Sequence, residues 1–214
     1  MVWAIVVAAG AGTRFGAQKQ FLMLDGRSVA AHAIEACRSV ADHVVLVVPA
    51  ERLSGDLPPD LQPDLVVAGG ATRAQSVRAG LAAVPLDVEI VVVHDAARPL
   101  ASAQLFLDAV AAINDGADAA ICATPVTDTI KRVDRRSGKT LVQETLDREA
   151  LVAVQTPQAF KASVLRSAHD GDGEATDDAA LVEALGHNVV IVEGNVANVK
   201  ITTPEDLDRL RGAR

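Results

Sequence analysis

The stretch that most constrains the fold runs from Ala4 to Phe21 and reads AIVVAAGAGTRFGAQKQF. It starts with Ile5 to Val7, a short continuous run of β-branched residues, which is typical of a strand buried on both faces in a parallel α/β sheet. Small residues follow, among them Gly10, Gly12 and Gly16. The backbone can therefore adopt unusual dihedral angles there and bring its N–H groups close to an anion. The stretch predicts a strand that leads into a phosphate-binding loop.

Two cations indicate what kind of phosphate site this loop belongs to. Its glycines nearly match the dinucleotide fingerprint, but three residues rather than two precede the last glycine. A dinucleotide loop holds a pyrophosphate that is never broken, and it relies on backbone N–H groups and a helix N-terminus. Arg14 and Lys19 instead suit a reaction in which negative charge builds up on phosphate. We therefore interpret the loop as part of a site for phosphate chemistry rather than for passive binding.

Length and charge bound the class of protein. A chain of 214 residues is expected to form a single domain, 1–214, and to bury about 70% of the surface that its unfolded form exposes. The formal net charge of −8 opposes general attraction to nucleic acid or to an anionic membrane. A phosphate ligand must therefore be met by a local cluster of cations, and neither nucleic acid nor a membrane is expected as a partner.

The cysteines and the apolar runs indicate a compartment. Cys37 and Cys122 lie far apart in apolar surroundings, without metal-like spacing, and are expected to be buried thiols. No apolar run approaches the ~20 residues of a membrane span, and the first ten residues lack the basic region of a signal peptide. We therefore expect a soluble protein in the reducing cytoplasm.

Strand and helix patterns alternate along the chain and predict an α/β fold, with a mostly parallel central sheet flanked by helices. Strands are expected near residues 5–7, 44–48, 65–68, 89–93, 117–123, 152–155 and 188–192. Helices are expected near residues 28–39, 72–84, 102–114, 163–168, 177–185 and from 204 onward. Ser102 and Thr176 are the expected N-caps of two of these helices. Neither a repeat nor a break in composition suggests a second domain.

The helix expected at 72–84 begins with a candidate anion site. Thr72 and Gln75 have the spacing of a capping box. Arg73 and Ser76 would then lie in the first turn, where free N–H groups and the helix dipole favour an anion. A plain helix cap with a solvated arginine is the alternative, and the sequence leaves both open.

The segment His94-Asp95-Ala96-Ala97-Arg98-Pro99 follows the strand expected at 89–93. Ligands of open parallel sheets bind beyond the carboxyl ends of the strands, so Asp95 is well placed to hold a magnesium ion that bridges nucleotide phosphates. Arg98 could brace Asp95. The alternative is that Asp95 caps the next turn and pairs with Arg98. His94 is expected to be structural.

Residues 126–147 differ in character from the rest of the chain. Two short alternating pieces, TIKRV and TLVQETL, flank Arg135 to Gly138, which predicts a β-hairpin arm. A two-stranded hairpin is marginal by itself, so its few apolar residues must pack on another surface. A partner subunit would provide that surface and would make the protein a homodimer. A lid that folds over its own subunit is the competing interpretation.

Lys200 is unusual because it lies in the apolar stretch Val196 to Ile201, just before the helix start Thr203-Pro204-Glu205-Asp206. A lone lysine in such a stretch usually extends its charged end to solvent. A phosphate site in an acidic protein would also use it.

Together these segments resemble the 2-C-methyl-D-erythritol 4-phosphate cytidylyltransferases of the non-mevalonate isoprenoid pathway. The resemblance spans nearly the whole chain, and its motifs are AAGAGTRFG followed by Lys19, GGATRAQSV, HDAARP, DTIKR, TPQAF, ATDDAALVE and NVKITTPEDL. It implies a Rossmann-like nucleotidyltransferase fold and a homodimer joined through the arm. It also implies that CTP and magnesium are required and that pyrophosphate is released.

The resemblance further implies roles for single residues. Arg14 and Lys19 would contact the triphosphate, and Lys200 would lie near the phosphate under attack. Asp95 would organise magnesium. The nucleotide would be lined by Ala8, Ala9, Gly10, Ala11, Gly12, Gly70 and Ser76. Methylerythritol phosphate would face Arg98, Thr156, Thr176 and, from the partner's arm, Thr129 and Arg148.

Ala71 departs from the family's pattern, because relatives often carry a polar or acidic residue there. This leaves open whether position 71 contacts the nucleotide through a side chain.

Three rival functions share parts of this pattern. A cytidylyltransferase for another polyol phosphate, such as ribitol 5-phosphate, would share the CTP half of the site. An NAD-dependent oxidoreductase should have an acid at the end of its second strand, where this chain has Pro49-Ala50. A nucleotide sensor would not need Lys19, Asp95 and Lys200 together.

Overall fold

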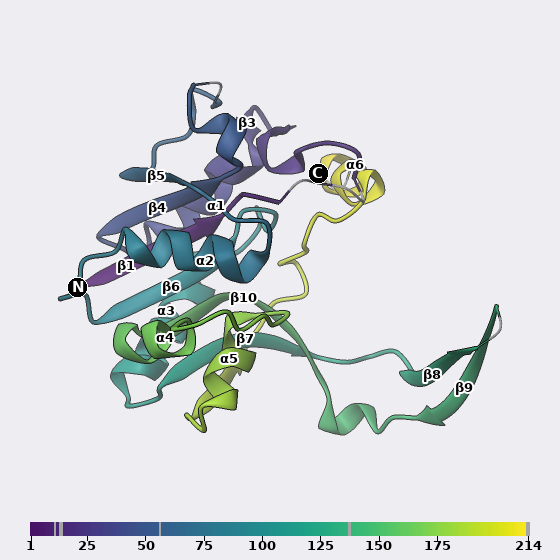
Figure 1. The fold of residues 1–214 in the computed structure, drawn as a ribbon. Helices are drawn as coiled ribbons and strands as arrows, with labels where there is room; N and C mark the ends of the chain where they lie inside the picture. The colour runs from purple at the N-terminus through teal and green to yellow at the C-terminus, as the bar shows by residue number, and fades with distance from the viewer. Residues whose placement is uncertain (11, 13–14, 56, 137, 213–214) are drawn as a thin grey trace.

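The computed structural model describes residues 1–10, 12, 15–55, 57–136 and 138–212, and within them one sheet organises the chain (Figure 1). Its strands are β1 (Val2–Val7), β4 (His43–Val48), β5 (Leu65–Ala68), β6 (Ile90–Asp95), β7 (Ala119–Pro125), β10 (Val152–Lys161) and β11 (Val189–Glu193). Their spatial order is β11-β7-β10-β6-β1-β4-β5. β10 runs antiparallel to β6 and β7, and the other neighbours are parallel. The expected mostly parallel α/β sheet is confirmed.

Helices cover both faces of this sheet. They are α1 (Val29–Cys37), α2 (Arg73–Ala82), α3 (Ala103–Asn114), α4 (Ala162–Ala168), α5 (Asp178–Ala184) and α6 (Pro204–Gly212). Short pieces are η1 (Lys19–Phe21), β2 (Met23–Leu24), β3 (Arg27–Ser28), η2 (Ala50–Arg52) and η3 (Arg148–Ala150). Side chains alternate along β1, so that Ala4 and Val6 pack with α1 and α3, whereas Trp3 and Ile5 pack with α2, α4 and α5. The continuous apolar run in β1 therefore reflects burial on both faces.

Both cysteines are buried, as expected, in the core on the α1 and α3 side of the sheet. Burial raises the pKa of the Cys122 thiol to about 12, so this thiol is not ionised at neutral pH. In the described part of the chain, none of the helices combines the length and the apolar character that crossing a membrane requires.

β10 is longer than expected. The sequence predicts a strand at 152–155 that ends before Thr156-Pro157-Gln158, but the strand continues through this motif to Lys161. Its pairing with β7 shifts register between Val154 and Gln158, and the Thr156–Pro157 peptide bond is cis. Proline has no N–H group to donate to a regular ladder. The strand accommodates Pro157 at the register shift, which places the motif in the middle of the sheet.

The helix caps differ in detail from those predicted. Thr72 Oγ1 accepts a hydrogen bond from Gln75 N at 3.1 Å, as a capping box requires, but Gln75 Oε1 accepts from Ala71 N at 2.9 Å instead of from Thr72 N. The cap of α5 is Asp177, not Thr176, because the Asp177 carboxylate accepts from Ala180 N at 3.1 Å. Ser102 has the extended backbone of an N-cap, but its side chain makes no capping hydrogen bond.

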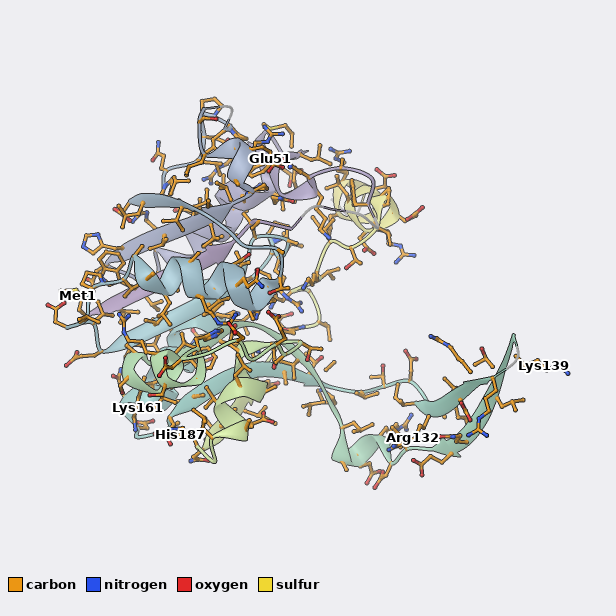
Figure 2. The ribbon with its side chains drawn as sticks, in the orientation of Figure 1. Met1, Glu51, Arg132, Lys139, Lys161 and His187 are labelled. Atoms are coloured by element: carbon orange, nitrogen blue, oxygen red, sulfur yellow. The ribbon has the colours of Figure 1, made fainter. Side chains whose placement is uncertain are left out.

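The predicted hairpin is present as β8 (Lys131–Arg136) and β9 (Lys139–Thr145). It stands away from the body of the protein (Figure 1), and Figure 2 shows Arg132 and Lys139 on it, far from the sheet. Its apolar side chains are open to solvent in this single chain: Leu141 is 55% exposed and Val142 is 62% exposed. The arm thus presents an apolar surface that its own subunit does not cover.

Candidate active site

The candidate site lies where β1 and β6 end side by side. The register pairs Val7 with Asp95, so the loop after β1 and the end of β6 meet at one edge of the sheet. β4 and β5 lie on one side of β1, and β6 lies on the other. Ligands of open α/β sheets bind at such a reversal of strand order, beyond the carboxyl ends of the strands.

A cavity of about 470 Å³ opens at this edge. Among its lining residues are these predicted site residues: Ala8, Ala9, Gly10, Gly12, Lys19, Gly70, Ser76, Asp95 and Lys200. Ala71 also lines it. The predicted residues Ala11 and Arg14 lie outside the described residues. Segments that lie far apart in the sequence, from Ala8 to Lys200, therefore line one cavity.

Close backbone approaches shape the wall of this cavity. Gly12 has φ +66°, and a Cβ atom there would lie 1.8 Å from the carbonyl oxygen of Ala17. A Cβ atom on Gly69 would lie 2.3 Å from the Cβ atom of Ala9. Gln20 is buried and fixes the loop by donating from Nε2 to the carbonyl oxygens of Ala8 at 2.6 Å and Gly10 at 3.1 Å. The small residues of the motif thus meet packing requirements as well as leaving room for a ligand.

Asp95 is the electrostatic centre of the site. Its Oδ2 atom lies 2.6 Å from Lys200 Nζ, and its Oδ1 atom lies 3.3 Å from Arg73 Nε. Burial by itself would raise the pKa of this carboxyl, but the two cations outweigh that effect and hold its pKa well below the usual range. Asp95 is therefore ionised at neutral pH, and two cations are held at the cavity wall.

Arg98 does not brace Asp95, contrary to the expectation from their proximity in sequence. Among the described residues, Arg98 is buried without an ion pair to Asp95, and it donates from Nη1 to the carbonyl oxygen of Asn198 at 2.7 Å. Asn198 Nδ2 in turn donates to the carbonyl oxygen of Thr156 at 2.9 Å, and Ile201 N donates to that of Ala97 at 2.9 Å. These bonds fix the segment that carries Lys200 across the end of β6.

His94 has the structural role expected of it. It is fully buried, and burial lowers its pKa to about 4, so the ring is neutral at physiological pH. Because the carbonyl oxygen of Arg98 can only accept, the ring nitrogen Nε2, 3.3 Å away, carries the proton. Nδ1 then accepts from the hydroxyl of Thr156 at 3.1 Å, and that hydroxyl oxygen accepts from Asp95 N at 3.0 Å. His94 thereby fixes the orientation of the Thr156 hydroxyl, which contacts the backbone N–H of Asp95.

A second cavity, of about 270 Å³, adjoins the first. Arg98, Thr156 and Thr176, the predicted acceptor residues of the body, all line it. Both cavities share the same three charged residues, Arg73, Asp95 and Lys200. The site therefore has two compartments on either side of one charged cluster.

The two acceptor residues predicted on the arm do not join either cavity of this chain. Thr129 and Arg148 are both exposed, and Arg148 Nη1 donates to the carbonyl oxygen of Thr127 at 2.7 Å. Their assignment to the site of a partner subunit remains a prediction.

The sequence named Arg73 as part of a candidate anion site but did not indicate its ion pairs with Asp95 and Asp178, and it did not single out Asp178. Arg73 is not simply a solvated arginine near a helix cap, because its side chain is 21% exposed and contacts both Asp95 and Asp178. Asp178 Oδ2 lies 2.7 Å from Arg73 Nη1, although the two residues are 105 positions apart. The position of Arg73 in GGATRAQSV was a partial signal, whereas Asp178 had none beyond its place in the ATDDAALVE motif.

The donor set around Asp95 fits a magnesium ion only if substrates supply most of its ligands. The described residues contain no group of three or more His, Cys, Asp or Glu side chains that could hold a metal. Magnesium commonly binds to one or two carboxylates together with phosphate oxygens and water. An ionised Asp95 at the wall of a phosphate-sized cavity is compatible with that mode.

Comparisons with known proteins agree with this geometry. A family model described as 2-C-methyl-D-erythritol 4-phosphate cytidylyltransferase, IspD, matches residues 2–211. A bifunctional enzyme IspD/IspF from Anaeromyxobacter sp. strain Fw109-5 is 47% identical over 98% of this chain and 56% of its own length. The chain thus spans about half the length of that relative.

Two other relatives match over most of their length. A 2-C-methyl-D-erythritol 4-phosphate cytidylyltransferase from Nocardia farcinica is 45% identical over 96% of this chain and 90% of its own. The crystal structure of the Thermus thermophilus protein with the same description has a TM-score of 0.82 and 35% identity, and covers 100% of this chain and 98% of that one. These findings show that the chain belongs to the 2-C-methyl-D-erythritol 4-phosphate cytidylyltransferase family of nucleotidyltransferases.

Proposed function

We propose that the protein joins CTP and 2-C-methyl-D-erythritol 4-phosphate to give 4-diphosphocytidyl-2-C-methyl-D-erythritol and pyrophosphate. The observation that carries this proposal is the pair of adjoining cavities that share Arg73, Asp95 and Lys200. The larger cavity, at the glycine loop, would take CTP. The smaller one, beside Arg98, Thr156 and Thr176, would take the acceptor phosphate, so that both substrates meet at the cations.

The chemistry needs no side chain that activates the nucleophile. A phosphomonoester has a second pKa of about 6, so its oxygen is already anionic at neutral pH and can attack the α-phosphorus of CTP in line. The obstacle is repulsion between two polyanions, followed by charge on the leaving pyrophosphate. Positioning and fixed cations would supply the catalysis. Lys19, Lys200 and Arg73 at the cavity walls fit that requirement.

Magnesium is part of the proposal, with Asp95 as the residue that would hold it. When bound, the ion would neutralise charge on the nucleotide phosphates. The ion pairs with Lys200 and Arg73 keep the Asp95 carboxylate ionised and oriented.

We infer the absence of nucleic-acid and membrane partners from the net charge, and the compartment from the two cysteines. A net charge of −8 supports the proposal that neither nucleic acid nor a membrane surface is a partner. Free, buried Cys37 and Cys122 are compatible with the reducing cytoplasm, which we propose as the site of action.

The function is tested by pyrophosphate release from the purified protein with magnesium and CTP. Parallel reactions contain methylerythritol phosphate, ribitol 5-phosphate or no acceptor. We expect release only with methylerythritol phosphate. Release with ribitol 5-phosphate alone would support the assigned CTP site but show that the acceptor is a different polyol phosphate. No pyrophosphate release with any acceptor would refute the proposal.

We further propose that the arm joins two copies of the chain into a homodimer. Leu141 and Val142 are exposed on β9, and a two-stranded hairpin of this kind needs a surface to pack on. Replacing both with Asp should convert a dimer into a monomer, as measured by light scattering during gel filtration. Activity should fall as the dimer dissociates, because Thr129 and Arg148 would no longer reach the partner's site.

Leu86→Asp provides the matched control for the arm. Leu86 is 86% exposed and lies outside the arm, so this change should leave the oligomeric state and activity intact. A wild-type monomer, or a dimer that survives the arm substitutions, would contradict the proposal. A wild-type monomer whose activity still depends on the arm would instead support a lid.

A further inference from the structure

A chain of charged contacts continues from Asp95 into the body, away from the two cavities. Arg73 donates from Nε to Asp95 at 3.3 Å and from Nη1 to Asp178 Oδ2 at 2.7 Å. The other oxygen of Asp178 lies 3.0 Å from His169 Nε2. The order Lys200, Asp95, Arg73, Asp178 alternates positive and negative charge and ends at His169.

Asp178 and His169 are set back from the substrates. Their side chains are 1% and 2% exposed, and neither residue lines the two cavities of the site. Asp178 is the first residue of α5, and His169 is the C-cap of α4. Among the described residues, Arg73 is the one that links this Asp178–His169 pair to Asp95.

Two acceptors on different elements fix the Arg73 guanidinium. The planar fork of an arginine presents its N–H groups in fixed directions, so binding Asp95 and Asp178 at once leaves little freedom to rotate. The remaining nitrogen, Nη2, is buried and has no partner among the described residues. Without Asp178, Arg73 would be free to turn its whole fork onto Asp95 and neutralise that carboxylate more completely.

We propose that Asp178 and His169 are positioning residues for the reaction: together they hold the Arg73 guanidinium at the wall of both cavities, so that it contacts one oxygen of Asp95 through Nε and keeps its positive charge fixed beside the substrate phosphates. This proposal rests on the cytidylyl transfer proposed above. It goes beyond that proposal by assigning the ends of α4 and α5 a part in turnover, which a purely structural network would not have.

The first test compares Asp178→Asn with Asp118→Asn. Asp118 lies in a separate ion pair with Lys161, at 2.9 Å, at the end of the body opposite the arm, where Figure 2 shows Lys161 and His187. We expect Asp178→Asn to lower kcat by about tenfold to 10²-fold while KM for CTP changes by less than about threefold. Asp118→Asn should leave both constants unchanged. Unchanged kcat in folded Asp178→Asn would overturn the proposal.

His169 provides a second variant should Asp178→Asn fail to fold. In His169→Gln the amide nitrogen can replace Nε2 as a donor to Asp178, whereas His169→Leu removes the donor. His169→Leu should lower kcat by about threefold to tenfold, which is less than the loss of a direct substrate contact would cause. His169→Gln should retain most of the wild-type kcat. Equal loss in both variants, in proportion to lowered thermal stability, would indicate a structural role only.

A measurement without turnover separates this proposal from the proposed function. In nitrogen-15 NMR of the arginine side chains, the Arg73 Nη1 hydrogens, which contact Asp178, should exchange slowly with water in the wild type and in Asp118→Asn, and rapidly in Asp178→Asn. Slow exchange in all three would refute the positioning role even if the enzyme is active. No pyrophosphate release by the wild type would refute the function, while the exchange rates would still decide whether Asp178 fixes Arg73.

Discussion

Asp95→Asn is expected to lower kcat by about 10²-fold to 10³-fold. The amide cannot pair as an anion with Lys200 at 2.6 Å and Arg73 at 3.3 Å, so both cations lose their common anchor. It is also a poor ligand for magnesium in place of a carboxylate. The expected result is measured as pyrophosphate release at saturating CTP and acceptor, over a range of magnesium concentrations.

Asp118→Asn controls for this change, since it removes the same charge from an ion pair outside the site. The magnesium titration separates two roles of Asp95. If higher magnesium restores turnover, Asp95 acts chiefly on the metal; if it does not, the arrangement of Lys200 and Arg73 matters more. Full turnover with the wild-type magnesium dependence would contradict the assignment of Asp95.

The depressed pKa of Asp95 also bears on pH dependence. A carboxyl with a pKa lower in the folded than in the unfolded state stabilises the fold above its unfolded pKa of about 3.9, and that stabilisation is lost as pH falls toward the folded value. Asp95 therefore stays ionised across the range in which the enzyme would work. An acid limb of activity should instead follow the acceptor phosphate, with its second pKa of about 6.

Local patterns predicted the frame of the protein well. The β-branched runs at Ile5 to Val7 and at Val44 to Val48 are buried strands because helices cover both faces of the sheet. The strand ends then fix where Asp95 and the glycine loop must lie, so their meeting at one edge followed from topology alone. Lys200 could be singled out because a lysine in an apolar stretch is conspicuous.

Contacts between distant segments could not be predicted in the same way. Asp178 and Arg73 are 105 residues apart, and no spacing rule connects the start of α5 to the start of α2. Arg98 was paired with Asp95 because it lies three positions away, but its guanidinium reaches Asn198 instead. Pro157 suggested the end of a strand, whereas a register shift lets β10 continue past it. In each case tertiary packing decided the outcome against local sequence.

Lys19→Ala is expected to lower kcat by about 10²-fold, which corresponds to about 3 kcal/mol of lost transition-state stabilisation. Lys19 begins η1 and lines the larger cavity beside Gly10 and Gly12. In the proposed reaction, a cation at the glycine loop would contact charge that increases as pyrophosphate leaves, so its removal should affect the transition state more than the bound nucleotide. Affinity for CTP, measured by calorimetry without acceptor, should therefore fall much less than kcat.

Lys161→Ala is the matched control, because Lys161 is a partly exposed lysine in an ion pair with Asp118, far from the glycine loop. It should retain wild-type kcat and wild-type affinity for CTP. Lys19→Arg should recover part of the lost rate, since it restores the charge with a different geometry. If Lys19→Ala weakened CTP binding but left kcat at saturating CTP unchanged, Lys19 would serve binding alone, and the catalytic role assigned to the glycine loop would be wrong.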